Sequence, residues 1–111
     1  MPGKFELYHD KSGGFRFRLK ASNGQIILSS QSYKNKSGCL KGIESVRANS
    51  AVEERFSKSE TKAGKYAFNL LAANKQVIGT SQQYKTTASR DKGIKSVMTN
   101  GKDANLVELI T

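Results

Sequence analysis

Seven consecutive positions near the N-terminus alternate between apolar and basic or small side chains. They span 15–21 and read Phe-Arg-Phe-Arg-Leu-Lys-Ala. Because neighbouring side chains of a strand point to opposite faces, this period of two predicts a half-buried β-strand. Its apolar residues are expected in the core, and Arg16, Arg18 and Lys20 are expected together on the opposite, solvated face.

Two further strands are predicted around this segment. Residues 5–8 form an apolar stretch that is followed by a turn sequence at 11–14. On the other side, Asn23-Gly24 predicts a two-residue hairpin turn that leads into a strand over 25–29. Each half of the chain is therefore expected to open with three consecutive antiparallel strands.

The spacing of apolar residues changes to three after Tyr33, at Leu40, Ile43 and Val46. This spacing is typical of a short amphipathic helix. A second helix is predicted around Ile94 and Val97. We expect Ser37 and Ser89 to be the N-caps, Asn49-Ser50 and Asn100-Gly101 to end the helices in the left-handed conformation, and Gly42 and Gly93 to mark close helix-to-sheet contact.

The chain repeats itself at an offset of 51 residues. Residues 15–49 align without a gap with residues 66–100, and 16 of these 35 positions are identical. Such matching predicts the same fold twice. Since a unit of about 50 residues can hardly bury a sufficient core alone, we expect one compact domain over 1–111, made of repeats at about 1–54 and 55–111 that pack around a pseudo-two-fold axis.

The same offset relates Phe5, Phe56 and Val107, so the opening strand occurs three times. The third copy has no strands after it and is expected to pair with the other repeat. The predicted fold is α+β: two tandem β3-α-β repeats form one antiparallel sheet with two short helices, and C-terminal strands are exchanged between repeats. We expect a monomer with internal pseudo-dimer symmetry rather than a homodimer.

The repeated residues resemble the YegP-like family of small uncharacterised bacterial proteins, in a tandem-duplicated form. The motif aromatic-x-F-x-L-x-A-x-N-x-Q-x-I, then S-x-x-Y, then G-I-x-S-V and an Asn, occurs at 15–49 and again at 66–100. Lys75 and Gly79 depart from the expected turn and third strand. The resemblance implies the fold just described and carries no activity or catalytic residues.

Charge is the compositional feature that bears on partners. Among 111 residues, 19 Lys and Arg against 9 Asp and Glu give a formal net charge of +10. A single cysteine and a single histidine argue against a disulfide framework and His-rich metal sites, so neither a metal nor a cofactor is expected. The absence of a long apolar segment predicts a soluble, cytoplasmic protein without membrane contact.

Two groups of residues are candidate binding sites for an anion. Arg16, Arg18 and Lys20 would attract phosphates; the alternative is a solvated face whose charges serve solubility. A repeated Ser-Gln-x-Tyr-Lys motif before each helix could bind an anion or stack a base, or it could only satisfy the backbone and cover the core edge. Its candidate residues are Tyr33, Lys34, Tyr84 and Lys85.

Catalysis has little support in the sequence. Cys39 lacks an evident general base, because His9 is predicted on the surface, and the carboxylates show no repeat-matched pairing. We therefore expect a non-enzymatic binding module with nucleic acid or another polyanion as its partner. The alternative is a protein-interaction or homo-oligomerisation module in which the charge serves only solubility.

Overall fold

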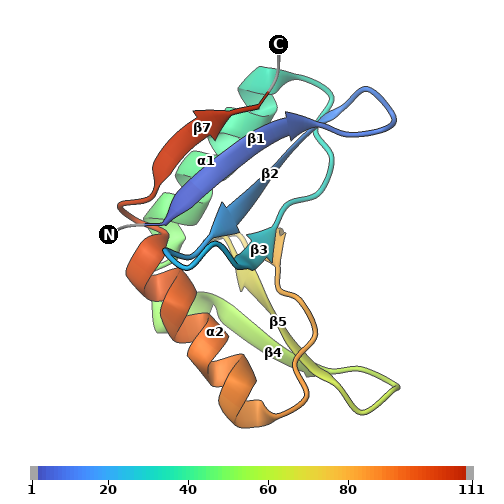
Figure 1. Cartoon of the computed structure of the whole chain (residues 1–111), viewed down its shortest axis with the longest axis vertical. Coiled ribbons are helices and arrows are strands. Elements are labelled where there is room, and N and C mark those ends of the chain that lie inside the picture. The colour runs from blue at the N-terminus through green and yellow to red at the C-terminus, as the bar shows by residue number, and fades with distance from the viewer. Residues whose placement is uncertain (1–2, 110–111) are drawn as a thin grey trace.

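The computed structural model describes residues 3–109, and one mixed sheet of seven strands runs through it (Figure 1). The first repeat contributes β1 (Lys4–His9), β2 (Phe15–Lys20), β3 (Ile26–Ser29) and α1 (Lys36–Asn49). The second contributes β4 (Phe56–Glu60), β5 (Tyr66–Leu71), β6 (Val77–Thr80), α2 (Thr87–Asn100) and β7 (Asn105–Glu108), and a short 3-10 helix, η1 (Glu53–Arg55), precedes β4.

The strand order β4-β5-β6-β3-β2-β1-β7 places the two repeats side by side, joined through β3 and β6. That junction pairs Ser29 with Thr80, which are equivalent residues of the two repeats. The α+β class, the tandem repeats and the transfer of the last strand to the other repeat are confirmed. The sheet is not wholly antiparallel, however, because β7 pairs with β1 in parallel.

Both helices cover the same face of the sheet. Because the sheet twists, α1 lies behind β1 and β2 in Figure 1, whereas α2 lies at the front, beside the start of β4. A single hydrophobic cluster lies between the helices and the sheet, and it includes Phe17 and Leu19 from β2 and Phe68 and Leu70 from β5. The alternation of the sequence thus fixed which face of each strand is buried. The opposite face of the sheet, here called the open face, carries no helix of residues 3–109.

Each helix begins at a capping side chain that lies two or three residues before the predicted one. Asn35 caps α1 by accepting a hydrogen bond from the Gly38 amide, and Thr86 caps α2 by accepting one from the Ser89 amide. The prediction of Ser37 and Ser89 as N-caps was wrong by two or three residues. Asn35 and Thr86 have the extended backbone that a capping residue needs.

The helices end at Asn49 and Asn100, as predicted, but for a different reason. Ser50 and Gly101 have φ values of −64° and −63°, so neither adopts the left-handed conformation. Instead, the side-chain amides of Asn49 and Asn100 each donate to a carbonyl four residues earlier.

The glycines inside the helices mark close contacts with the sheet side, as expected. A Cβ at Gly42 would collide with the Tyr33 hydroxyl, and it would lie 2.9 Å from Phe17. Gly93 stands in the same relation to Tyr84 and Phe68. These glycines serve packing, because no larger residue fits between helix and ring.

The hairpin turns differ from the predicted two-residue form. In the first, the Gly24 amide donates to the Ala21 carbonyl and the Ala21 amide donates to the Gln25 carbonyl, so three residues lie inside the turn. Only Gly24 has positive φ, at 86°, and Lys75 takes its place in the second repeat with φ of 71°. The turn of the second repeat therefore has the same geometry as the first, although Lys75 replaces the glycine.

Candidate polyanion interface

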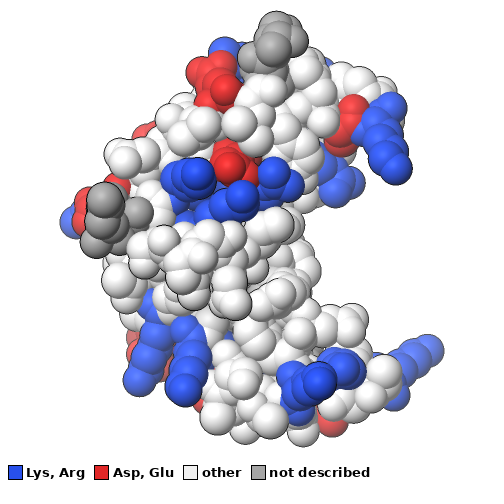
Figure 2. Space-filling view, viewed as in Figure 1, with Lys and Arg blue, Asp and Glu red and all other residues white. Residues whose placement is uncertain are grey.

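Four basic side chains gather on the open face of β1 and β2. Arg16, Arg18 and Lys20 alternate along β2 with buried Phe17 and Leu19, which fixes their common direction. Lys4 of β1 is paired in register with Lys20 and joins them. Figure 2 shows Lys and Arg side chains around acidic atoms in a band over this half of the molecule.

A buried carboxylate lies at the centre of this group. Glu6 is 5% exposed and pairs in register with Arg18. Its carboxylate lies 2.7 Å from Arg18 Nε, 3.2 Å from Lys20 Nζ and 3.8 Å from Lys4 Nζ. One negative charge thus holds three positive ones, and the cluster keeps an excess of positive charge while its side chains are fixed in place.

The protonation of Glu6 reflects this environment. Burial by itself raises the pKa of a carboxyl group, because it penalises the charged form. Hydrogen bonds and charge from Arg18 and Lys20 outweigh that effect and hold the Glu6 pKa below its ordinary value of 4.5. Glu6 is therefore ionised at neutral pH and orients the basic side chains around it.

Arg16 has a separate partner at the end of the hairpin. Its Nε lies 3.5 Å from Asp10 Oδ2. Asp10 also accepts hydrogen bonds from the Ser32 hydroxyl, the Ser12 hydroxyl and the Ser12 and Gly14 amides, and these lower its pKa well below the ordinary range. Asp10 thus organises the turn that joins β1 to β2 and anchors one end of the basic surface.

Tyr8 is the aromatic side chain beside the basic group. It lies on β1 opposite Arg16, and the Arg18 guanidinium carbon lies 4.8 Å from its ring centroid. Such a contact is a cation–π interaction, which orients the guanidinium. Tyr8 is half-buried, so its ring supports Arg18 and also forms part of the open face.

The structure does not bring Tyr33 and Tyr84 to this surface. The Tyr33 ring stacks on Phe17 with centroids 6.3 Å apart, and Tyr84 stacks on Phe68 at the same distance. Both rings therefore lie on the helix side of the sheet. Burial and the nearby Cys39 raise the pKa of Tyr33. The expected combination of stacking tyrosines with the basic strand is not formed.

Lys34 and Lys85 are exposed in the loops that lead from each repeat's sheet to its helix. They are not part of the group formed by Glu6, Lys4, Arg18 and Lys20, here called the Glu6 cluster. In the same motif, Ser30 and Ser81 accept hydrogen bonds from the amides of Phe17 and Phe68 and donate to the next residue's carbonyl. The serines of the motif therefore satisfy the backbone at the end of the third strand.

The second repeat does not repeat this basic group. One register-linked row crosses the sheet through Glu6, Arg18, Ser29, Thr80 and Asn69, passing from charged to uncharged side chains. The positions equivalent to Glu6, Tyr8, Arg16, Arg18 and Lys20 are Ser57, Ser59, Ala67, Asn69 and Leu71, and only Lys4 has a basic equivalent, Arg55. The cluster of cations around a carboxylate is therefore confined to the first repeat.

Sequence reasoning missed Glu6 and Tyr8, although a signal for both exists. Residues 4–8 alternate as Lys-Phe-Glu-Leu-Tyr, which places Lys4, Glu6 and Tyr8 on the face opposite Phe5. Applying the rule used for β2 to this shorter stretch would have identified them. Their contact with Arg18 also needs the strand register, which the alternation alone does not give.

Other candidate chemistry is sparse within residues 3–109. Cys39 is buried, and burial raises the pKa of its thiol to about 11, which disfavours the reactive thiolate. No three His, Cys, Asp or Glu side chains of this range are grouped so that they could hold a metal ion. None of its helices combines the length and apolar character needed to cross a membrane.

Comparison with known sequences gives two consecutive matches to one family. Its description is "Domain of unknown function (DUF1508)", and the matches cover residues 10–56 and 61–108. The chain is 56% identical over 109 residues to a UPF0339 protein in the ptx operon 5′ region of Stutzerimonas stutzeri, covering 98% of both chains. It is 52% identical over 101 residues to the UPF0339 protein YegP of Escherichia coli, covering 91% of this chain and 92% of that one.

Solved structures show the same similarity. The solution structure of the protein of unknown function yegP from E. coli matches with a TM-score of 0.94 and 48% identity, covering 99% of this chain and 95% of that one. The solution structure of a UPF0339 protein from Shewanella oneidensis matches with a TM-score of 0.93 and 52% identity, covering 99% and 93%. Each family match covers the second and third strands and the helix of one structural repeat, whereas β1 and most of β4 lie outside the two matches.

Proposed function

The chain belongs to the DUF1508 family and carries its domain twice, and we propose that it is a non-enzymatic module that binds polyanions, nucleic acid first among them. The observation that carries this proposal is the Glu6 cluster on the open face of β1 and β2. Lys4, Arg18 and Lys20 surround a single carboxylate, and Arg16 extends the basic surface along the same strand.

Fixed cations favour anion binding for two reasons. Lys and Arg that neutralise phosphates release condensed counterions, which drives association in a salt-dependent manner. Side chains already held by Glu6 and Tyr8 lose less conformational freedom on binding than free ones. Tyr8 supplies an aromatic surface for a base, in place of Tyr33 and Tyr84. This arrangement predicts binding without sequence-specific readout.

Fluorescence anisotropy of labelled mixed-sequence single-stranded and duplex oligonucleotides, at about 50 and 200 mM salt, tests the proposal. Affinity is expected in the micromolar range and to weaken steeply with salt. The double variant Arg16→Ala with Arg18→Ala should lower the affinity about tenfold and reduce the magnitude of the salt slope by one to two, roughly one for each phosphate contact.

The matched control removes the same charge elsewhere. Lys41→Ala with Lys92→Ala changes two exposed and equivalent helix residues, on the other side of the sheet. If both double variants lose affinity equally, net charge rather than the open face is responsible and the proposed site is wrong. Absence of binding at the lower salt concentration would reject the function itself.

A second candidate function, a protein-interaction module, is favoured by a different observation. β4 is the terminal strand of the sheet, and within residues 3–109 no strand pairs with its outer edge. An open strand edge is a common docking site for extended peptides.

A further inference from the structure

The two repeats differ at the outer edges of their first strands. β1 and β4 are equivalent, but β7 covers the outer edge of β1, whereas β4 ends the sheet within the described residues. The C-terminal strand of the chain therefore shows what fits beside a strand of this kind. The first repeat serves as a template for the second.

In this template the outer strand, β7, is short and runs parallel to β1. β7 pairs Leu106 with Phe5 and Glu108 with Leu7. The Leu109 amide donates to the Leu7 carbonyl at 2.8 Å, and the Asn105 amide donates to the Gly3 carbonyl. The backbone groups of β1 that point toward β7 thus belong to Gly3, Phe5 and Leu7. The side chains of Phe5 and Leu7 face the helices. On β4 the equivalent groups are those of Glu54, Phe56 and Lys58; the Phe56 amide already donates to the Glu53 carbonyl, which leaves the Phe56 carbonyl and the Lys58 amide and carbonyl for a partner strand.

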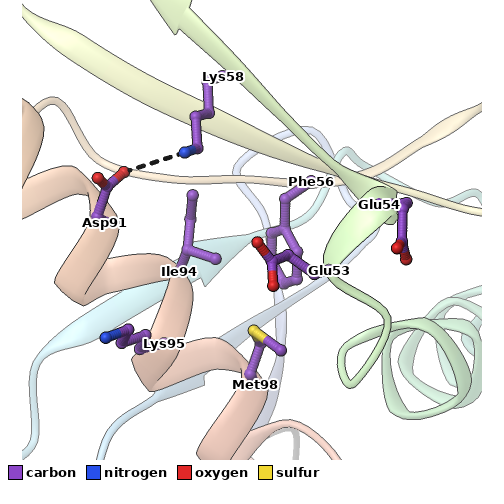
Figure 3. Close-up of a pocket in the computed structure, with 8 residues that line it drawn as sticks. All are labelled: Glu53, Glu54, Phe56, Lys58, Asp91, Ile94, Lys95 and Met98. Carbon is purple, nitrogen blue, oxygen red and sulfur yellow. Dashed lines mark ion pairs between the residues drawn. The ribbon is translucent and has the colours of Figure 1, made fainter.

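A groove lies beside β4 where the template has β7. It has a volume of about 530 Å³ and lies between β4, η1 and α2. Phe56, Ile94 and Met98 give it an apolar floor, as Figure 3 shows. Phe5 is fully buried beneath its neighbours, while the equivalent Phe56 is only half-buried. A strand beside β4 would cover this remaining apolar surface.

Charges at the groove set the chemistry of its occupant. Lys58 and Asp91, at the positions of Leu7 and Leu40, form an ion pair at 3.4 Å with both side chains about half exposed (Figure 3). Lys95 lines the groove without a carboxylate within 4.0 Å among the described residues. At the other end, Glu53 and Glu54 precede β4.

We propose that the outer edge of β4 binds an extended segment of a partner protein, aligned parallel to β4. An apolar side chain of the segment lies beside Phe56, and a carboxylate two residues later lies beside Lys58 and Lys95. A basic residue before the apolar one lies near Glu53 and Glu54. The pattern is that of residues 102–108, where Lys102 precedes Leu106 and Glu108 follows it.

A partner protein fits better than a second copy of this chain. Each copy carries a formal charge of +10, so joining two copies opposes like charges. A segment with a carboxylate at the Lys58 position complements the groove instead. This inference deepens the protein-interaction candidate and is independent of the basic surface on β1 and β2, which lies on the other face of the sheet.

The probe is a synthetic peptide with the sequence of residues 102–109, Lys-Asp-Ala-Asn-Leu-Val-Glu-Leu, titrated into the full-length ¹⁵N-labelled protein. Saturable shifts are expected at the amides of Phe56, Lys58 and Glu60 and at Met98. A control peptide with Asp at the position of Leu106 should produce no saturable shifts, because a carboxylate is not accommodated against the apolar floor of the groove. Saturable shifts confined to β1, or equal shifts from both peptides, would overturn the proposal.

Two variants of one residue separate the backbone from the side chain. Lys58→Pro removes the outward amide and should weaken peptide binding at least about tenfold, whereas Lys58→Ala keeps the amide and should weaken it by no more than about fivefold. Preserved amide-shift dispersion shows that each variant folds. Equal effects of the two variants would contradict pairing through the backbone.

Sedimentation of the protein alone tests the other occupant. A concentration-dependent dimer that Lys58→Pro abolishes would identify a second copy at this edge and overturn the proposal. Oligonucleotide anisotropy of the same Lys58→Pro sample keeps the two functions apart, because loss of peptide binding should leave the affinity for oligonucleotides unchanged.

Discussion

Ser50 and Gly101, equivalent residues of the two repeats, pack directly against each other. A Cβ placed on Gly101 would lie 2.6 Å from both the Cβ and the Oγ of Ser50. Ser50 is fully buried, and Ser29 and Thr80, another equivalent pair, face each other at the junction of β3 and β6. The pseudo-two-fold axis passes between the members of both pairs. At Ser50 and Gly101 there is room for one side chain only.

Making the two repeats identical at this point should therefore destabilise the protein. Gly101→Ser should lower the free energy of unfolding by about 1–3 kcal/mol, because the backbone at φ −63° accepts serine and the cost is overpacking alone. Urea denaturation measures this change.

A double variant that exchanges the two residues tests whether Ser50 and Gly101 are coupled across the axis. Adding Ser50→Gly to Gly101→Ser moves the single side chain across the axis and should recover more than half of the lost stability. If the double variant is no more stable than Gly101→Ser alone, the two residues are not coupled and the packing argument fails.

The turn residues Gly24 and Lys75 allow a paired test of backbone strain. Lys75 has φ of 71°, a region that costs a non-glycine residue about 1 kcal/mol or more. Lys75→Gly should raise the stability by about 1 kcal/mol, and Gly24→Lys should lower it by a similar amount, since a Cβ at Gly24 meets nothing within 4 Å. Two changes of the same sign in thermal denaturation would disprove this account.

Phe17 and Phe68 are equivalent core residues with fully buried side chains. Truncation of either to alanine should cost about 3–5 kcal/mol, because each ring packs between the opening strand's Phe and the Tyr of its own repeat. Denaturant unfolding checks both variants. A loss below about 1 kcal/mol in either would contradict the assignment of the buried face.

Cys39 should behave as a buried apolar residue. An aromatic disulfide reagent is expected to modify its thiol only at the rate of unfolding, and addition of urea to the midpoint of unfolding should speed the reaction. Since the folded pKa is about 11 against an ordinary value of 9.0, the contribution of the thiol to stability is present below pH 9 and is lost as pH rises toward 11. Cys39→Ala should remove that part of the alkaline decline.

Much of this architecture could be predicted because both the repeat and the alternation of apolar and polar residues can be seen in the sequence itself. Residues 15–21 gave the buried face of β2 correctly, and the 51-residue offset predicted the transfer of the last strand. The N-caps could not be assigned in this way. Asn35, Ser37 and Gly38 are all residue types that can cap a helix, and the backbone conformation decides which of them does so. The parallel direction of β7 depends on how the chain crosses the end of the sheet after α2, which no local pattern records.

The candidate site was predictable only in part, for a related reason. Alternation placed Arg16, Arg18 and Lys20 on one face, but the pairing of Arg18 with Glu6 depends on the register between two strands. Tyr33 was a candidate for binding because its motif, which is repeated, precedes a helix, and the alternative was that it covers the edge of the core. In the structure that repetition reflects a repeated packing contact with Gly42, so symmetry was a sign of the core rather than of a site.

Glu6 links the stability of the protein to pH. Its pKa is below 4.5 in the folded state, and the ordinary value applies when the chain unfolds. A carboxyl group with a lowered folded pKa contributes stability that is fully present above its unfolded pKa and is lost as pH falls through the folded value. Unfolding free energies are therefore expected to decrease from about pH 5 downward, with Glu6 among the groups responsible.

The variant Glu6→Gln should show less of this acid dependence and should be less stable at pH 7 by about 1–2 kcal/mol. The cost stays below the 3–5 kcal/mol of a fully buried ion pair because Lys4, Arg18 and Lys20 keep contact with water. Glu44→Gln is the matched control, since that carboxylate is exposed and pairs with Arg47 within one helix, where such pairs contribute only a few tenths of a kcal/mol. If the two variants had the same effect at pH 7 and at pH 3, Glu6 would not be the carboxylate that holds the basic surface together.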